Sequence, residues 1–444
     1  MIRRPRLHPF QADHERIRRA VLTAVDARRL VADRLRVTSA SLHAGGRAVP
    51  LANRKIWILS VGKAAIPMTQ AAAAALGADR IAGGVAVAPE GARGTCEPVS
   101  VVPAGHPVPT SVAGATAIER IVQGVGPEDI VVCLLSGGGS ALLAAPPDGV
   151  ALADLAEMTL LLLRSGADIE AVNTVRRHVS RLQGGRLLAA LHPATVITFI
   201  LSDVLVGNAR SIASGPTVED PTTFADARDV LRRLGLWERA PESVRRHLLA
   251  GVAGEKDETP KPGDPRFAGA QPLLLAGNAT AVEAARREAR RLGFDVSPSG
   301  RLLTGEAREE GSYVGEQILR LARSATRKWA WIGGGETVVT VRGDGLGGRN
   351  QELAASAARA LEGLPDASLT ALATDGRDGP TAAAGALVDG ETARRARAAG
   401  LDLADALERN DCYRALSSAG DLIFTGLTQT NVADVCWALG GATR

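Results

Sequence analysis

Residues Ile130–Leu143 read IVVCLLSGGGSALL, an apolar run that ends abruptly in a loop of serines and glycines. The six apolar residues before the loop predict a buried strand, and the apolar residues that resume at Ala141 predict a helix. Glycines let backbone N–H groups approach a ligand, and a helix N-terminus favours negative charge. The loop, which comprises Ser136, Gly137, Gly138, Gly139 and Ser140, is therefore interpreted as an anion site, although a tight turn without a ligand also fits.

Strand-like and helix-like segments alternate along most of the chain, which predicts an α/β protein with largely parallel sheets. The predicted strands are Ile56–Val61, Val85–Ala88, Val99–Val102, Ile130–Leu135, Thr195–Leu201, Leu273–Ala276, Trp329–Ile332, Val338–Val341, Leu369–Ala373 and Leu422–Phe424. The predicted helices are Ala64–Leu76, Val112–Val122, Leu152–Arg164, Val172–Leu182, Ala281–Leu292, Ala307–Ala325 and Gln351–Leu361.

Composition indicates a soluble enzyme that acts on small molecules. Of the 444 residues, 45% are apolar and 23% charged, whereas aromatic residues make up only 3%. A net charge of +4 and so few aromatic side chains argue against a nucleic-acid partner, and no apolar run is long enough for a membrane span. A homo-oligomer remains open.

The cysteines and the N-terminus carry little specific chemistry. The four cysteines form no C-x-x-C pair, which argues against a zinc site or a disulfide framework and favours a cytoplasmic location. The Arg-rich segment Met1–Leu35 has apolar residues at helical spacing but no signal-peptide core, so it is interpreted as a helix with a solvated basic face.

The length predicts two or three domains, and residues 251–265 are the natural boundary because their prolines, glycines and charges cannot form a core. We therefore expect a Rossmann-like α/β domain over residues 1–250, a linker or exposed excursion over 251–269, and a second α/β domain over 270–444.

In the first half, polar residues follow predicted strands. Lys63 lies at a helix start, where a cation is unfavourable unless an anion sits beside it, although a solvent-facing lysine is the simpler reading. Asp203 lies just past a strand, where open α/β sheets bind ligands. Asn173 and Arg176 share a helix face, which is more often a solvated face than a site.

The second half repeats this arrangement. Glu336 follows one predicted strand, Arg349 opens a helix, and Asp375 and Asp378 follow another strand. Each loop alone could be ordinary turn chemistry. Together with Lys63 and Asp203, they predict an active-site cleft between two α/β domains.

Eight ordered motifs carry a family resemblance. They are SVGKAA from Ser60, AGHPVP from Ala104, LSGGGSAL from Leu135, NTVRRHVS from Asn173, IASGPT from Ile212, GGET from Gly334, GGRNQE from Gly347 and TDGRDGPT from Thr374. In this the chain resembles the glycerate 2-kinase family, some of whose members bear the older label hydroxypyruvate reductase. The resemblance implies two Rossmann-like domains, the second of the MOFRL type, and phosphorylation of the 2-hydroxyl of D-glycerate with ATP and Mg²⁺.

Under this resemblance, the Ser136–Ser140 amides and Lys63 hold an anionic group, and Arg349 captures a carboxylate or phosphate. Asp203 and Asp375 are candidates for metal ligand and base, without an assignment between them. The remaining candidate binding residues are Asn173, Arg176, Glu336, Asn350, Asp378 and Asn431.

The chain also departs from the family pattern. An expected Gly-Asp pair is replaced within Leu205-Val206-Gly207-Asn208, and Arg377, Ala382, Leu427 and Gln429 are unusual at their positions. Two other functions stay open. An NAD(P)H-dependent hydroxypyruvate reductase would need a G-x-G-x-x-G loop, which neither Gly137–Leu142 nor Gly333–Val338 completes. A catalytically silent sugar-acid-binding protein is the other.

Overall fold

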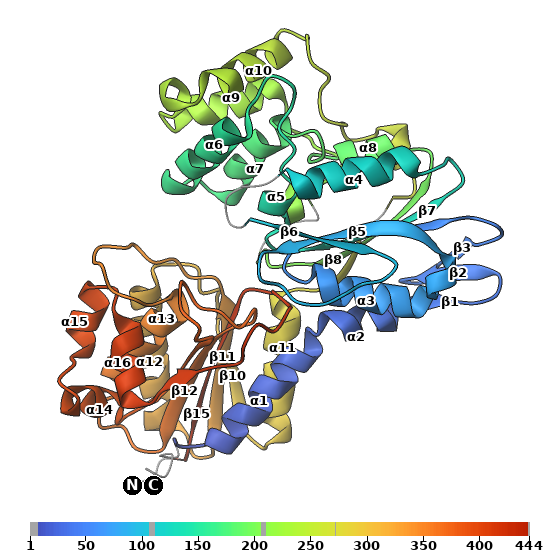
Figure 1. Ribbon diagram of the computed structural model, residues 1–444. Helices are drawn as coiled ribbons and strands as arrows, with labels where there is room; N and C mark the ends of the chain where they lie inside the picture. Colours follow the sequence, from blue (N-terminus) through green and yellow to red (C-terminus); the bar gives the residue numbers. More distant parts are fainter. Residues whose placement is uncertain (1–7, 106–111, 206–209, 271, 443–444) are drawn as a thin grey trace. The chain divides into compact units, whose positions relative to one another are not determined.

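The computed structural model describes residues 8–105, 112–205, 210–270 and 272–442, and the chain divides into two compact units. One unit comprises Ala27–Leu275, and the other combines Met1–Asp26 with Ala276–Arg444. Figure 1 follows the chain through both. No helix in the described ranges combines the length and the apolar composition that crossing a membrane requires.

The Ala27–Leu275 unit is built around a six-stranded sheet with the order β6-β5-β4-β7-β8-β9. The pairs β4/β5, β5/β6, β4/β7 and β7/β8 are parallel. Counted along the chain, this is the 3-2-1-4-5-6 strand order of a Rossmann fold, so the prediction for this unit is confirmed. The strands are β4 (Ile56–Val61), β5 (Ile81–Pro89), β6 (Ser100–Ala104), β7 (Ile130–Ser136), β8 (Thr195–Leu201) and β9 (Leu273–Ala276), preceded by an antiparallel sheet of β1 (Leu35–Val37), β2 (Ser41–Ala44) and β3 (Arg47–Pro50).

Helices cover both faces of this sheet (Figure 1). Leu59, Val61 and Val131 on one face pack with apolar residues of α4 and α8, whereas α3 contacts β4, β5 and β7. Four further helices, α6, α7, α9 and α10, share a core of their own that includes Val175 and Phe224. The helices are α2 (Ala27–Arg34), α3 (Ala65–Leu76), α4 (Ala113–Gly124), α5 (Gly139–Leu142), α6 (Leu152–Arg164), α7 (Ile169–His178), α8 (Arg186–Leu191), α9 (Phe224–Arg233) and α10 (Glu242–Val252), with short 3-10 turns η1 (Ala78–Arg80), η2 (Ile212–Ser214), η3 (Trp237–Arg239) and η4 (Pro265–Phe267).

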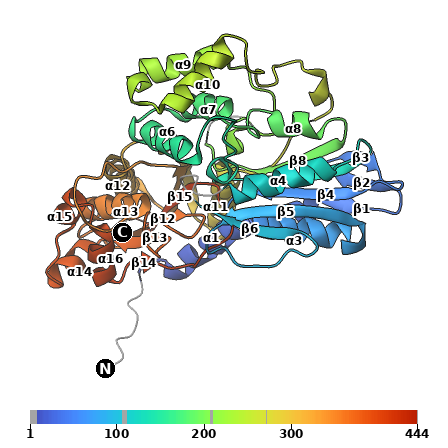
Figure 2. The same cartoon turned by 45° about the horizontal axis from the view of Figure 1, so that its top comes forward.

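The other unit contains a six-stranded sheet with the order β10-β11-β15-β12-β13-β14. Apolar residues of helices α12–α16 form a core with the strands of this sheet, and α1 packs beside α11 (Figure 2). The strands are β10 (Asp295–Pro298), β11 (Trp329–Gly335), β12 (Ala367–Ala373), β13 (Gly385–Asp389), β14 (Leu422–Ile423) and β15 (Asp434–Gly440). The helices are α1 (Gln11–Ala24), α11 (Asn278–Arg291), α12 (Ala307–Ser324), α13 (Arg349–Ala360), α14 (Thr392–Ala398), α15 (Leu403–Glu408) and α16 (Cys412–Ala419).

The expectation of a mostly parallel sheet is wrong for this second unit. Only β10 and β11 pair in parallel among its described strands, and the pairs β11/β15, β12/β15, β12/β13 and β13/β14 are antiparallel. Two strands that the sequence analysis missed account for this. β15 lies between β11 and β12 and runs opposite to both, and β13 pairs antiparallel with β12 and β14. Val338–Val341 is not a strand, since only an isolated bridge joins Val338 to Glu306.

The division of the chain also differs from the expected boundaries. Residues Met1–Asp26 group with the C-terminal unit. Ile17, Val21 and Val25 are fully buried there, while Arg16 and Arg19 are exposed, in line with the predicted helix with a solvated basic face. Residues 251–269 begin and end inside the Ala27–Leu275 unit, so they are an excursion of that unit and not a linker between units.

Candidate functional site

Three candidate segments meet at one edge of the parallel sheet. Val61 of β4 lies beside Leu135 of β7, and Ser136 of β7 lies beside Leu201 of β8. Lys63, the Ser136–Ser140 loop and Asp203 therefore all follow the carboxyl ends of neighbouring strands. The strand order reverses between β4 and β7, and such a switch point is where open α/β sheets bind ligands.

The loops after β4 and β7 are locked together by close packing. Gly62 has a φ of +125°, and a Cβ added there would lie 2.3 Å from Oγ of Ser136. The Lys63 N–H donates to the Gly137 carbonyl at 2.9 Å, and the Ala64 N–H donates to the Ser136 hydroxyl at 3.0 Å. Since α3 begins at Ala65, half-buried Lys63 stands just before a helix N-terminus, as the sequence predicts.

A chain of buried polar groups continues from the glycine-rich loop. Gly138 is left-handed and precedes the single turn of α5, which begins at Gly139. The hydroxyl of Ser214, which is fully buried, lies 3.0 Å from the Ser140 hydroxyl and 2.8 Å from Oδ1 of Asn173. Asn173 also donates from Nδ2 to the Ser211 carbonyl. Asn173 is thus tied to the loop through Ser214, a residue of the IASGPT motif that was not among the candidate site residues.

Arg176 lines a pocket beside this chain. The polar lining residues of the pocket are Ser140, Thr159, Arg176, Ser180 and Gln183, and its apolar ones are Ala141, Ala144, Leu155 and Val179. Burial lowers the pKa of Arg176 to about 10. No described residue forms a hydrogen bond or ion pair with its guanidinium. An unpaired, partly buried guanidinium is costly by itself and is relieved by an anionic ligand.

Arg349 in the other unit has the opposite surroundings. Its Nε and Nη2 donate to the Asp434 carboxylate at 2.6 and 3.1 Å, and its Nη1 lies 2.8 Å from Glu336. Burial would lower the pKa of Arg349, but the charges of Asp434 and Glu336 raise it above its usual range. The fork expected to capture a ligand is therefore already occupied by carboxylates of the same unit.

Asp378 and Asn350 form a helix cap. The N–H groups of Asn350 and Gln351, in the first turn of α13, donate to the two oxygens of Asp378 at 3.0 and 2.8 Å. The Asn350 and Gln351 side-chain amides also donate to this carboxylate. Burial raises the pKa of Asp378 to about 6. These contacts give Asp378 and Asn350 a structural role at the N-terminus of α13.

Asp375 and Asn431 lie near the same end of the second sheet. Asp375 follows β12, is half-buried, and accepts a hydrogen bond from the Arg377 N–H at 3.0 Å. Asn431 is buried and accepts from the Ala433 N–H at 3.3 Å. Among the described residues, no group of three or more His, Cys, Asp or Glu side chains is arranged to hold a metal ion.

Comparison with known proteins identifies the family. Residues 13–249 match a family described as a domain of unknown function (DUF4147), and residues 329–434 match the MOFRL family. A glycerate 2-kinase from Pyrococcus horikoshii is 40% identical, with 95% of this chain and 96% of that protein covered. The chain belongs to the glycerate 2-kinase family.

Two further relatives of this glycerate 2-kinase family chain bear on its activity. The crystal structure of a glycerate kinase from Thermotoga maritima superposes with a TM-score of 0.81 at 37% identity, covering 97% of this chain and 99% of that one. A protein from Agrobacterium vitis, 40% identical with 85% of each chain covered, bears a provisional hydroxypyruvate reductase name, an older label in the family.

The remaining motifs and unusual positions differ in what the structure describes of them. His106–Pro109 and Val206–Asn208 lie outside the described residues. Gln429, one of the positions where the sequence analysis expects a departure from the family pattern, has a φ of +56°. Asp434, the main partner of Arg349, was missed because its only signal is an acid before a short apolar run.

Proposed function

We propose that this chain transfers the γ-phosphoryl group of ATP to the 2-hydroxyl of D-glycerate, giving 2-phosphoglycerate and ADP. The near-full-length similarity to proteins named glycerate 2-kinase carries this proposal. In the reaction, the bond between the γ-phosphorus and its bridging oxygen breaks, a bond to the 2-oxygen forms, and the hydroxyl proton passes to a base.

The Arg176 pocket is our choice for the hydroxy-acid carboxylate. Its guanidinium has no partner among the described residues, and a carboxylate would supply the missing charge. Ser140 and Gln183 also line the pocket and offer polar groups, while the side chains of Leu155 and Val179 suit a short carbon chain. In this proposal Asn173, which lies about one turn before Arg176 on α7, contacts the substrate hydroxyls.

The switch point between β4 and β7 is our choice for the nucleotide phosphates. Backbone N–H groups of Gly138 and Gly139 would face a phosphate, with Lys63 as the point charge beside it. Mg²⁺ bound to a nucleotide needs only one or two protein carboxylates, because phosphates and waters fill the other positions. The carboxylates of Asp203 and Asp375 are our candidates for that role. Bound Mg²⁺ would neutralise phosphate charge.

Asp203 and Asp375 lie in different units, and their shared participation in one reaction stays a prediction. We propose that one of them contacts the metal and that the other accepts the hydroxyl proton. Asp203→Asn and Asp375→Asn separate the roles, because excess Mg²⁺ should partly restore turnover only in the variant that lost a metal contact. Equal rescue of both, or of neither, would remove this division.

A coupled assay with the purified chain tests the activity itself. We expect ADP release with D-glycerate and MgATP, and no NADH oxidation with hydroxypyruvate. Lys63→Ala should reduce turnover roughly a hundredfold, whereas Lys55→Ala, an exposed lysine just before β4, should not. NADH oxidation without ADP release would favour the reductase, and D-glycerate binding without either reaction would favour the silent binding protein.

We also propose a cytoplasmic location. The four cysteines are buried free thiols, which supports a reducing compartment. Measurement of activity in cell fractions tests this location.

A further inference from the structure

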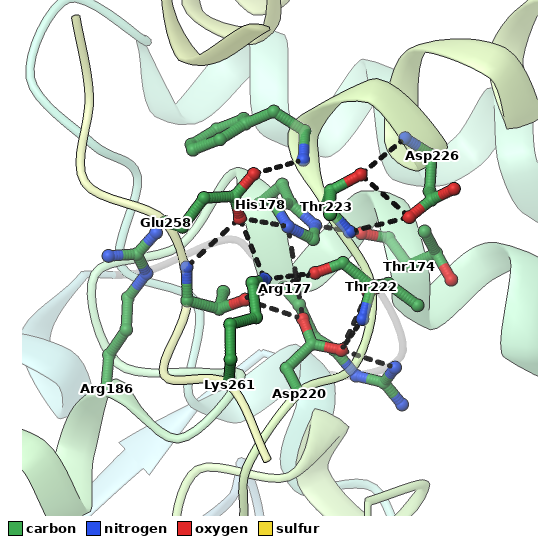
Figure 3. A network of polar contacts seen from close by, with 12 residues as sticks. Thr174, Arg177, His178, Arg186, Asp220, Thr222, Thr223, Asp226, Glu258 and Lys261 are labelled. Atoms are coloured by element: carbon green, nitrogen blue, oxygen red, sulfur yellow. Dashed lines mark hydrogen bonds and ion pairs between the residues drawn. The ribbon is translucent and has the colours of Figure 1, made fainter. Parts of the chain in front are cut away.

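Residues 253–264, here called the strap, connect α10 to the short turn η4. Residues 253–258 of the strap are exposed, but Thr259 and Pro260 are buried. Figure 3 shows its side chains reaching into a polar network with residues of α7 and the segment 220–226. An exposed excursion would not be expected to place polar groups at such depth.

Glu258 connects the strap to the end of α7. One of its oxygens accepts from the Phe224 N–H at 2.9 Å, and the other contacts Lys261 at 2.9 Å and Nε2 of buried His178 at 3.3 Å. Burial raises the pKa of Glu258, but these hydrogen bonds lower it overall to about 2. These contacts favour the negatively charged form of Glu258, which lies against the last residue of α7.

Thr259 makes a second connection. Its hydroxyl donates to Oδ2 of Asp220 at 3.0 Å, and the other oxygen of Asp220 contacts Nη1 of Arg177 at 3.3 Å (Figure 3). All three side chains are almost fully buried. Arg177 in turn donates to the Arg210 carbonyl, at the start of the segment that contains Ser214. The strap is thus linked through Asp220 to α7 and to the Ser214 turn.

The strap also packs against the backbone behind the pocket. A Cβ added to Gly184 would lie 2.9 Å from Cγ2 of Thr259. The N–H groups of Gly184 and Gly185 donate to the carbonyls of Ser214 and Gly215 at 3.0 and 2.7 Å. Gln183, just before this turn, donates to the Ser140 carbonyl at 2.8 Å.

The turn supported in this way is strained. Ala213 and Ser214 have φ values of +51° and +56°. Non-glycine residues in the left-handed region are strained and persist only where their surroundings hold them. Such strain concentrates at functional sites, and here it fixes the Ser214 hydroxyl between Ser140 and Asn173.

We infer that the strap is a working part of the hydroxy-acid site, with Glu258 and Thr259 as positioning residues that hold Asn173 and Arg176 on α7 and the Ser214 turn in place. Neither residue touches the substrate in this arrangement. The inference rests on the proposed function. Its physical basis is that a helix fixed at its C-terminal end by buried charges carries its other polar side chains in one orientation.

Thr259 provides the sharper test. Thr259→Val keeps the packing against Gly184 but removes the hydroxyl, whereas Thr259→Ser keeps the hydroxyl. We expect the Val variant to raise KM for D-glycerate about tenfold, with KM for ATP changed by less than about twofold. The Ser variant should restore KM for D-glycerate. A structural role alone would lower stability without this selective effect.

Glu258→Gln provides an independent test at a partly exposed side chain, so it should fold even if Thr259→Val does not. We expect a selective rise in KM for D-glycerate, and the matched control Glu255→Gln, at an exposed position of the strap, should behave as wild type. Wild-type kinetics in folded Glu258→Gln, or an equal change in both KM values, would overturn the inference. A wild-type chain without ADP release would instead overturn the proposed function.

Discussion

Arg176 and Arg349 are both half-buried arginines among the candidate site residues, yet they have opposite surroundings. Arg176 lines a pocket and has no partner among the described residues. Arg349 is held by Asp434 and Glu336. Burial lowers the pKa of Arg176, whereas in Arg349 the neighbouring carboxylates outweigh burial and raise it.

The difference separates two uses of a buried cation. A guanidinium paired within its own unit contributes to the fold, and removing it leaves a buried carboxylate uncompensated. A guanidinium without a partner weakens the fold and is retained for a ligand. Residue type and position in a motif do not distinguish these uses, because they depend on the neighbours supplied by distant segments.

The largest expected effect is on stability at Arg349. Arg349→Met should lower the free energy of unfolding by about 3 kcal/mol, because the Asp434 carboxylate is left buried without its partner. Denaturant unfolding measures this. Asp434→Asn is the matched control, since the loss of Arg349 should be much smaller once residue 434 is neutral. Additive losses in the double variant would contradict the pairing.

The same substitution at Arg176 should weaken substrate binding without lowering stability. Arg176→Met should leave the free energy of unfolding unchanged or higher, because an unpaired buried charge is removed. We expect kcat/KM for D-glycerate to fall roughly a hundredfold, as one charge-assisted contact is lost. Steady-state kinetics and denaturant unfolding on the same samples measure both. A stability loss equal to that of Arg349→Met would break the comparison.

His14 extends the comparison to a buried base with neutral partners. Its ring nitrogens contact the hydroxyls of Ser368 and Thr370 at 2.9 and 2.8 Å, and burial lowers its pKa from 6.5 to about 3. A lowered histidine pKa means that the unfolded chain binds the proton first. The stabilisation is therefore complete above pH 6.5 and is lost as the pH falls toward 3.

At pH 5 this loss should be about 2 kcal/mol. The measurement is denaturant unfolding at pH 7 and pH 5 for wild type and His14→Asn, with exposed His43→Asn as the control. The pKa of Asp378 is raised to about 6, so protonation of Asp378 stabilises the fold as the pH falls from 7 to 5. The quantity that isolates His14 is therefore the difference in unfolding free energy between wild type and His14→Asn at each pH. Identical pH dependence in His14→Asn would rule out His14 as the source.

The smallest expected effect concerns backbone strain. Ala213 and Ser214 are left-handed beside the pocket, and Gln429 is left-handed in the other unit. Gln429→Gly should raise the free energy of unfolding by less than about 1 kcal/mol, because relief of strain is partly offset by the greater freedom of the unfolded chain. A thermal midpoint that falls would show that the Gln429 side chain contributes more than its backbone costs.

The first half of the fold was predictable because β4, β7 and β8 are buried on both faces, which requires continuous apolar runs. The second half was harder. β15 was missed as a strand, and strand direction, which makes its pairs with β11 and β12 antiparallel, leaves no local signal in the sequence. Val338 and Val341 have the composition of a strand, but their side chains are 56% and 75% exposed and lack a neighbouring strand.

Some residues of the candidate site were likewise predictable from the sequence and others were not. Lys63, Ser136–Ser140 and Asp203 follow strands of one parallel sheet, so topology alone brings them to one edge. The partner of Arg349 could not be predicted, since Asp434 lies far away in sequence. Thr259 was dismissed with its polar, proline-rich surroundings, although its hydroxyl meets a buried carboxylate.

The N-terminal helix α1 belongs to a unit whose other residues begin at Ala276. During synthesis, α1 leaves the ribosome long before its packing partners α11 and β12 are made. Ile17 and Val21 therefore stay exposed until the whole Ala27–Leu275 unit has been synthesised. A fragment starting at Ala276 would lack this helix and expose the surface it covers. Fusing residues 1–26 to the end of that fragment should restore its solubility. The helix should pack on its unit from either end of the chain, because packing depends on its being close to that surface and not on when it is translated.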